Sequence, residues 1–158
     1  MSRIRRRTLA GLSVGDAFTV TRVFSEDEVR RFADLTRDYN PIHFDLRFCG
    51  AKGIPRTVCH GLLVGGMLTE IGGQIGWLAR DINLRFIKPV FCGQTVTCTL
   101  TLTTLDDRGR ARATVMWEDA DKGDRLAEGL LTGVLPQPPE LAVMAQMVAE
   151  GDSSNKLR

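Results

Sequence analysis

The chain has 158 residues, 43% of them apolar and 25% charged, with a formal net charge of +2 at pH 7. These values predict one globular domain with a buried core, and the near-neutral balance excludes a broad basic face for nucleic acid. Much of the positive excess lies in an arginine cluster at residues 3–7. We expect it to form a solvated basic arm over residues 1–11, because chain ends fray unless something holds them.

The cysteine and histidine spacings argue against disulfides and metal. The sequence contains four cysteines, Cys49, Cys59, Cys92 and Cys98. They form no Cys-x-x-Cys pair, and the first residues lack the apolar core of a signal segment, so we expect reduced thiols and a cytoplasmic protein. The two histidines, His43 and His60, lack the close spacing of a zinc-binding helix, and no metal is expected.

The chain then enters a strand and a helix. Residues 17–24 are rich in β-branched and aromatic side chains, which predicts a strand. Ser25 and Glu28 have the spacing of a capping box at the start of a helix. The apolar stripe that follows predicts that this helix covers residues 26–37.

A proline ends that helix and starts a loop. Pro41 disfavours helical backbone at Asn40, so an irregular, rigid loop is expected there. Asp45 is a predicted N-cap for one further helical turn over residues 46–51.

Residues 56–78 form an apolar stretch that contains six glycines. Because it is apolar on nearly every side, we predict a buried central helix wrapped closely by a sheet. A membrane span is not expected, because Thr69, Glu70 and Gln74 interrupt an apolar run that needs roughly 20 residues.

The second half of the chain reads as strands. The predicted strands cover residues 81–90, 94–105, 110–118 and 125–135, with turns at residues 106–109 and 119–123. Alternation of apolar residues and threonines in the second of these strands predicts an antiparallel sheet with one buried face.

The predicted fold class is α+β, with one domain over residues 12–135 in which a single antiparallel sheet wraps a long central helix. Residues 136–158 form an extension with a short amphipathic stretch at 140–149 and a disordered polar end. One sheet edge would stay open, so we expect a homodimer that closes it across a two-fold axis.

The loop sequence Asp38-Tyr39-Asn40-Pro41-Ile42-His43 contains candidate catalytic groups. Proline fixes the middle of this loop, so Asp38 and His43 can point to one spot and act as general acid and base. The alternative is that Asp38 caps a helix end and His43 is a hydrogen-bonded core residue.

His60 and Gly61 open the predicted buried helix. The Gly61 N–H can bind a ligand oxygen, because a glycine lets a ligand approach the backbone. The alternative is a glycine needed only for close packing of helix and sheet. We expect His60 to bond a backbone carbonyl and fix the turn.

Three sequence pieces together are similar to one family. The strings DYNPIHFD, VCHGLLVGG and RFIKPVFCGQTV resemble the signature of the MaoC-like hydratases, the (R)-specific enoyl-CoA hydratases of the hot dog fold. The resemblance implies that Asp38 and His43 are the catalytic pair and that the Gly61 N–H binds the thioester oxygen. It also implies that Asn40 shapes the loop and that Thr69 is a hydroxyl residue near the site, although Thr69 can equally bond its own helix.

The implied reaction is reversible syn addition of water to trans-2-enoyl thioesters, which gives (R)-3-hydroxyacyl thioesters. The substrate carrier would be coenzyme A or an acyl carrier protein, and no separate cofactor is expected. The acyl tail would lie along the glycine-rich helix, where Leu62 and Gly65 help to set the depth of its tunnel. The alternatives are a hot dog acyl-CoA thioesterase, a 3-hydroxyacyl-carrier-protein dehydratase subunit, and a non-catalytic subunit that binds acyl thioesters.

Overall fold

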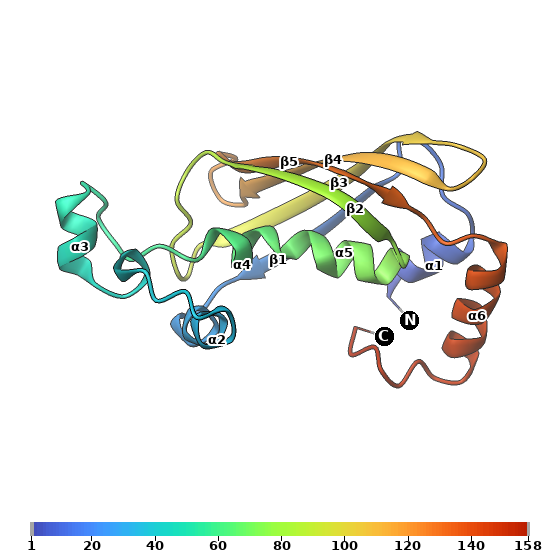
Figure 1. The fold of residues 1–158 in the computed structure, drawn as a ribbon, viewed down its shortest axis with the longest axis horizontal. Coiled ribbons are helices and arrows are strands. Elements are labelled where there is room, and N and C mark those ends of the chain that lie inside the picture. The colour runs from blue at the N-terminus through green and yellow to red at the C-terminus, as the bar shows by residue number, and fades with distance from the viewer. Residues whose placement is uncertain (1, 158) are drawn as a thin grey trace.

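The computed structural model describes residues 2–157 and has one antiparallel sheet that arches over a pair of central helices (Figure 1). The strands are β1 (Ala17–Val23), β2 (Leu78–Phe86), β3 (Thr95–Leu105), β4 (Arg110–Asp119) and β5 (Arg125–Val134). Their order in the sheet is β1-β3-β4-β5-β2, so β1 and β2 are the edges. The predicted architecture is confirmed.

Strand β3 carries the predicted alternation. Val96, Cys98 and Leu100 are completely buried against the helices, whereas the intervening threonines face the outer side of the sheet. There the Thr99 hydroxyl pairs with the hydroxyl of Thr19 in β1 at 3.0 Å. The period of two in the sequence therefore assigns the two faces of the sheet correctly.

The central helix begins at Gly61, as predicted, but it is interrupted. It consists of α4 (Gly61–Gly65) and α5 (Met67–Ile75). At the junction the Thr69 N–H donates to the Gly66 carbonyl at 2.9 Å, which tightens the turn to i→i+3 bonding at a residue of low helix propensity.

The apolar stretch of residues 56–78 extends past this helix at both ends. Gly76 ends α5 in the left-handed conformation at φ 79°, so Leu78 already belongs to β2. Before the helix, Val58 pairs with Phe91 in an isolated antiparallel bridge, so this part of the stretch is not helical.

The helices near the loop follow the sequence prediction closely. In α2 (Glu26–Thr36), the side chain of Ser25 and that of Glu28 form the predicted reciprocal capping box. The helix ends one residue before the predicted boundary, because Arg37 turns left-handed at φ 60°. Asp45 caps α3 (Leu46–Ala51) by accepting the Arg47 N–H at 2.8 Å.

The N-terminal arginine cluster is not a solvated arm. Residues Arg3–Leu9 form α1, and Arg5 is only 8% exposed. Its guanidinium donates to the carbonyls of Gly73 and Gln74, at 3.0 and 3.2 Å, and thus bonds the last turn of α5. The expectation of a frayed arm was wrong because these carbonyls have no intrahelical donor and recruit the arginine.

The C-terminal extension is ordered against the same helix end. After α6 (Pro138–Ala149), Asp152 is 6% exposed and accepts a hydrogen bond from Arg5 at 3.1 Å. Asn155 bonds both Asp152 and Gln74. We call Arg5, Gln74, Asp152 and Asn155 the terminal clasp. The expected disorder of the polar end is therefore wrong over the part that the structure describes.

Different elements lie at the two ends of the central helices. The terminal clasp, α1 and α6 lie at the C-terminal end of α5, and α2 and α3 lie beyond the N-terminal end of α4 (Figure 1). The loop between α2 and α3 therefore reaches the first turn of α4. Within residues 2–157, no helix has the length and apolar character needed to cross a membrane.

Candidate active site

Two hydrogen bonds between residues close in the sequence hold the loop that follows α2. The Asn40 N–H donates to Asp38 Oδ1, and the Ile42 N–H donates to Asn40 Oδ1, each at 3.2 Å. The second bond caps η1, the single 3₁₀ turn Pro41–His43. Asn40 thus shapes the loop from within, and Pro41 fixes the turn that presents His43.

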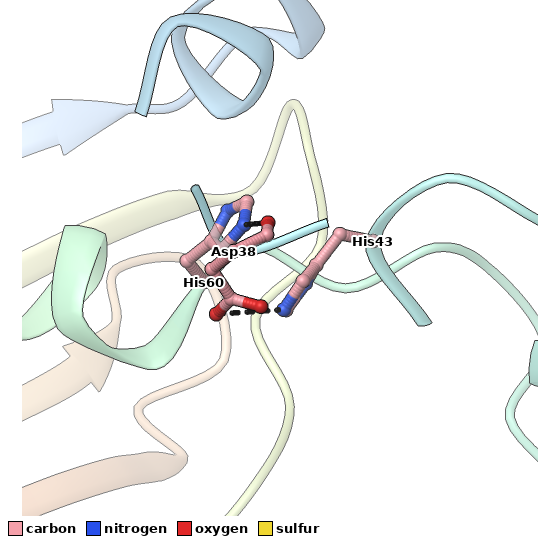
Figure 2. A group of neighbouring side chains, drawn as sticks. All are labelled: Asp38, His43 and His60. Carbon is pink, nitrogen blue, oxygen red and sulfur yellow. Dashed lines mark hydrogen bonds and ion pairs between the residues drawn. The ribbon is translucent and has the colours of Figure 1, made fainter. Parts of the chain in front are cut away.

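Asp38 and His43 face each other across this loop (Figure 2). His43 Nδ1 lies 2.7 Å from the Val58 carbonyl oxygen, so this nitrogen carries the proton and donates it. The other nitrogen, Nε2, is left as an acceptor and lies 3.9 Å from Asp38 Oδ2. The Asp38 side chain is 51% exposed and that of His43 only 10%, so one member of the pair faces solvent and the other is mostly buried.

The separation of these two atoms suits a shared water. A gap of 3.9 Å is too long for a direct hydrogen bond. A water at about 2.8 Å from both atoms would sit at the apex of a nearly right-angled triangle, which is compatible with the directions of its two O–H bonds. The pair can therefore hold one water and accept both of its hydrogen bonds.

Burial lowers the pKa of the His43 imidazole below its ordinary value, and the neighbouring His60 lowers it further. The bond to the Val58 carbonyl and the charge of Asp38 act in the opposite direction, but they do not cancel the effect of burial. His43 is consequently neutral at pH 7, which leaves the Nε2 lone pair available to take a proton.

His60 links the loop of Asp38 and His43 to the start of α4. Its Nε2 lies 2.9 Å from the Asp38 carbonyl oxygen, and its ring stacks on that of His43 with centroids 3.7 Å apart. The ring is buried, and Phe32 packs against it at 5.2 Å. His60 Nδ1 has no hydrogen-bond partner among the described residues. One side chain thus fixes the backbone of Asp38 and the ring plane of His43 together.

Gly61 supplies a backbone donor next to His43. It is the first residue of α4, so its N–H has no intrahelical acceptor. Gly61 and His43 both line a cavity of about 270 Å³, whose wall also includes Val64 and Phe86. The edge of the Phe86 ring lies where a side chain on residue 61 would begin, because a Cβ there would be 2.9 Å from Cζ. Glycine at position 61 therefore lets the first turn of α4 pack against Phe86, which is the close-packing alternative that the sequence left open.

Three predicted site residues lie elsewhere. Leu62, Gly65 and Thr69 are not among the residues that line this cavity. The Thr69 hydroxyl donates to the Gly66 carbonyl at 2.7 Å, which is the alternative that the sequence left open. Gly65 gives close packing, because a Cβ there would come within 2.9 Å of Leu84 Cδ1.

Sequence reasoning missed two groups at the site. The Val58 carbonyl orients His43, and a backbone carbonyl leaves no signal in the sequence. Phe86 lines the cavity from the edge strand β2. Phe86 lies within the strand predicted over residues 81–90, but its contact with Gly61 depends on how the sheet packs on the helix.

Asp38, His43 and His60 also bring three potential metal ligands within 4.8 Å of one another. One nitrogen of each histidine is already engaged with a backbone carbonyl. The two rings are stacked at 26°, so their remaining lone pairs lie in nearly parallel planes rather than converging on one ion. This geometry suits a bound water better than a metal, and the expectation of no metal stays a prediction.

The sequence matches the family model described as MaoC like domain over residues 12–120. Among curated relatives, an (R)-specific enoyl-CoA hydratase of Aeromonas caviae is 33% identical over 98 residues, which cover 60% of this chain and 73% of the relative. A mitochondrial 3-hydroxyacyl-[acyl-carrier-protein] dehydratase of Arabidopsis thaliana is 33% identical over 97 residues, or 60% of this chain. The chain spans only 57% of the length of this plant relative.

Further similarity covers more of the chain. A 3-hydroxyacyl-thioester dehydratase Z of Mycobacterium tuberculosis is 31% identical over 117 residues, which cover 67% of this chain and 76% of the relative. Among solved structures, an (R)-hydratase from A. caviae involved in PHA biosynthesis superposes with a TM-score of 0.74 at 30% identity. That superposition covers 80% of this chain and 98% of the A. caviae chain.

Proposed function

The chain belongs to the MaoC-like domain family and has its hot dog fold, and on this premise we propose that it is an (R)-specific enoyl-thioester hydratase. The reaction is the reversible syn addition of water to a trans-2-enoyl thioester, which gives an (R)-3-hydroxyacyl thioester. The observation that carries the proposal is that Gly61 and His43 line one cavity, with Asp38 positioned to share a water with His43.

The Gly61 N–H provides the electrophilic half of the site. Attack of water at the β-carbon of an enoyl thioester pushes negative charge onto the thioester oxygen. A preorganised backbone donor at that oxygen stabilises the charge where it develops, and such donors typically contribute about 10²–10³ in rate. The apolar walls that Val64 and Phe86 contribute exclude competing water from the enoyl group.

Asp38 and His43 provide the proton-transfer half. His43 Nε2 and Asp38 Oδ2 hold the water, and the neutral imidazole can accept a proton as the oxygen attacks. The α-carbon then takes a proton from the same pair, on the face where water was added, which gives the syn outcome. Because the two groups share one water, their titrations are coupled and belong to the pair.

The substrate carrier is part of the proposal. The plant relative carries an acyl-carrier-protein dehydratase name and the A. caviae relative an enoyl-CoA hydratase name. Either carrier delivers the same enoyl thioester to the cavity, and coenzyme A would then be part of the substrate rather than a cofactor. We propose coenzyme A as the carrier for the first assays, because the A. caviae relative is covered over 73% of its length.

We also propose that the protein is a homodimer paired through β2. This edge strand exposes apolar side chains, with Leu78 72%, Ile82 49% and Phe86 50% exposed. An open apolar edge favours pairing with a second copy, which would satisfy its free backbone groups. Pairing at this strand would cover Phe86 and thereby complete the wall of the cavity.

The test is a hydration assay with a trans-2-enoyl-CoA. We expect loss of the conjugated enoyl absorbance without release of free thiol, and an (R)-3-hydroxyacyl product. Asp38→Asn should lower kcat by about 10²–10⁴, the usual contribution of an acid–base group, and leave the fold intact. Asp27→Asn is the matched control, because Asp27 is an exposed carboxylate on α2 that pairs with Arg31.

The outcomes separate the competing functions. Free thiol released from a saturated acyl-CoA would support a thioesterase instead. Tight acyl-CoA binding without turnover would support a non-catalytic subunit. An (S) product, or full activity in Asp38→Asn, would contradict the hydratase proposal.

A further inference from the structure

Two cysteine side chains meet beside the start of α4. Cys59 Sγ and Cys92 Sγ lie 3.8 Å apart, in contact but unbonded. Both belong to the short antiparallel pairing in which Val58 faces Phe91 and the Cys59 N–H donates to the Val90 carbonyl at 2.7 Å. In such a pairing Cys59 and Cys92 are diagonal neighbours on one face, which is why their side chains converge.

The pair combines one reachable thiol with one buried thiol. Cys92 is partly exposed and lines a surface cavity of about 390 Å³ together with Arg56 and Thr57. Cys59 is buried. Burial, together with the nearby Cys92, raises the pKa of the Cys59 thiol to about 12. A small oxidant arriving from solvent therefore meets Cys92 first.

The other two cysteines lack both features of this pair, a partly exposed thiol and a neighbouring thiol. Cys49 is fully buried and its thiol donates to the Ile42 carbonyl at 3.3 Å. Cys98 is fully buried in β3, and burial raises its pKa to about 12. Within residues 2–157, neither thiol forms a hydrogen bond with a second sulfur. Cys49 and Cys98 therefore serve as internal controls.

We propose that Cys59 and Cys92 form a dithiol site that peroxide oxidises reversibly to an intramolecular disulfide. The Cys92 thiol gives up its proton, and its sulfur attacks hydrogen peroxide and breaks the O–O bond. The sulfur is oxidised to a sulfenic acid, and the hydroxide that leaves takes up the released proton as a water. The Cys59 sulfur then attacks the sulfenic sulfur, the S–S bond forms, and the departing hydroxide takes the Cys59 proton as a second water. The sum is two thiols and one peroxide giving one disulfide and two waters.

Closure of this bond should disturb the catalytic residues. The sulfurs must approach by about 1.8 Å to reach disulfide length. Cys59 directly precedes His60 and Gly61, and His60 in turn holds the Asp38 carbonyl and the His43 ring. The effect on activity rests on the proposed hydratase function. We expect oxidation to lower kcat by about tenfold to a hundredfold, because displacements near 1 Å at a reacting site cost that much.

The experiment treats the reduced full chain with hydrogen peroxide and reads the thiols directly. We expect two of the four cysteines to become unreactive, a mass loss equal to two hydrogens, and a peptide crosslink between residues 59 and 92. Dithiothreitol should restore the mass, the thiols and the hydration rate. Cys92→Ser should keep its rate under the same treatment, and Cys98→Ser should be inactivated like the unsubstituted chain.

A second variant tests the order of events. Cys59→Ala leaves the reachable thiol without its partner, so Cys92 should accumulate a sulfenic acid that dimedone traps. A crosslink that involves Cys49 or Cys98, crosslinks only between chains, or four unchanged thiols would overturn the proposal. A crosslink in a chain that never hydrates enoyl thioesters would refute the hydratase function and leave the dithiol site standing.

Discussion

Asp38, His43 and His60 depend on one another for their positions. The Asp38 backbone is bonded by the His60 ring, the His60 ring stacks on His43, and His43 is bonded to the Val58 carbonyl. Each contact joins residues that are separated in the sequence. The precision of the pair therefore comes from a small network rather than from the rigidity of the loop alone.

The first residue-scale prediction concerns pH. Because the pKa of His43 is lowered, the rate should fall on the acidic side only below about pH 6.5, where the imidazole takes up a proton. The unfolded chain binds this proton first as pH falls, so the His43 contribution should lower the free energy of unfolding between about pH 6.5 and the folded pKa. Rate profiles and urea titrations on the native chain and His43→Asn measure both effects. An acidic limb above pH 7 would contradict the lowered pKa.

The second residue-scale prediction separates the two roles of His60. His60→Gln keeps a donor for the Asp38 carbonyl but loses the stacking on His43, whereas His60→Phe keeps a stacked ring and loses the donor. We expect kcat to fall by about tenfold or more in each, with KM nearly unchanged, because the network positions groups that act in the transition state. His60→Phe should also raise the pKa of His43, since His60 lowers it. Equal, unshifted pH profiles would mean that His60 only fills space.

At the scale of elements, the site depends on how closely α4 approaches β2. A Cβ on Gly61 would be 2.9 Å from the Phe86 ring, and one on Gly65 equally close to Leu84 Cδ1. Glycine at these two positions allows the helix to lie against the edge strand. The same closeness shapes the wall of the cavity.

We therefore predict a coupled pair at this contact. Gly61→Ala should cost about 1–3 kcal/mol of unfolding free energy, as overpacking typically does. Phe86→Leu in the same chain should recover part of that loss, and the coupling in a double-mutant cycle should exceed about 0.5 kcal/mol. Thermal or urea unfolding measures both quantities. Additive effects would mean that Phe86 moves away without cost.

The elements were largely predictable from local signals. The Ser25 and Glu28 pattern, Pro41 and the alternation in β3 act over a few residues, so they predict boundaries well. The break at Gly66 was missed, because the long apolar pattern continues through it and only the bonding of Thr69 interrupts the helix. The family resemblance named Asp38, His43 and Gly61, but only the fold shows the contacts of Val58 and Phe86.

At the scale of the whole molecule, the terminal clasp joins segments far apart in the chain. Arg5 and Asp152 are separated by 147 positions and meet at the last turn of α5. No local sequence pattern predicts a contact between residues so far apart. The composition of the two ends therefore suggested a frayed N-terminal arm and a disordered C-terminal end. The buried pair holds two terminal helices on the core.

We predict that this clasp contributes strongly to stability. Arg5→Ala should lower the free energy of unfolding by about 3–5 kcal/mol, because it leaves the buried Asp152 carboxylate without its partner. Arg7→Ala is the matched control, since Arg7 forms a more exposed pair with Asp16 and should cost less than about 1 kcal/mol. Urea denaturation of the two variants compares them. Similar losses of unfolding free energy in the two variants would show that water compensates the Asp152 carboxylate once Arg5 is removed.

The same clasp bears on how the protein is made. The carbonyls of Gly73 and Gln74 receive a side chain from position 5, and that side chain receives its counter-ion from position 152. Residue 152 is translated after all five strands and leaves the ribosome after them, so an N-terminal helix that docks earlier holds a guanidinium without its counter-ion. That helix should therefore lock into place only once Asp152 can reach Arg5.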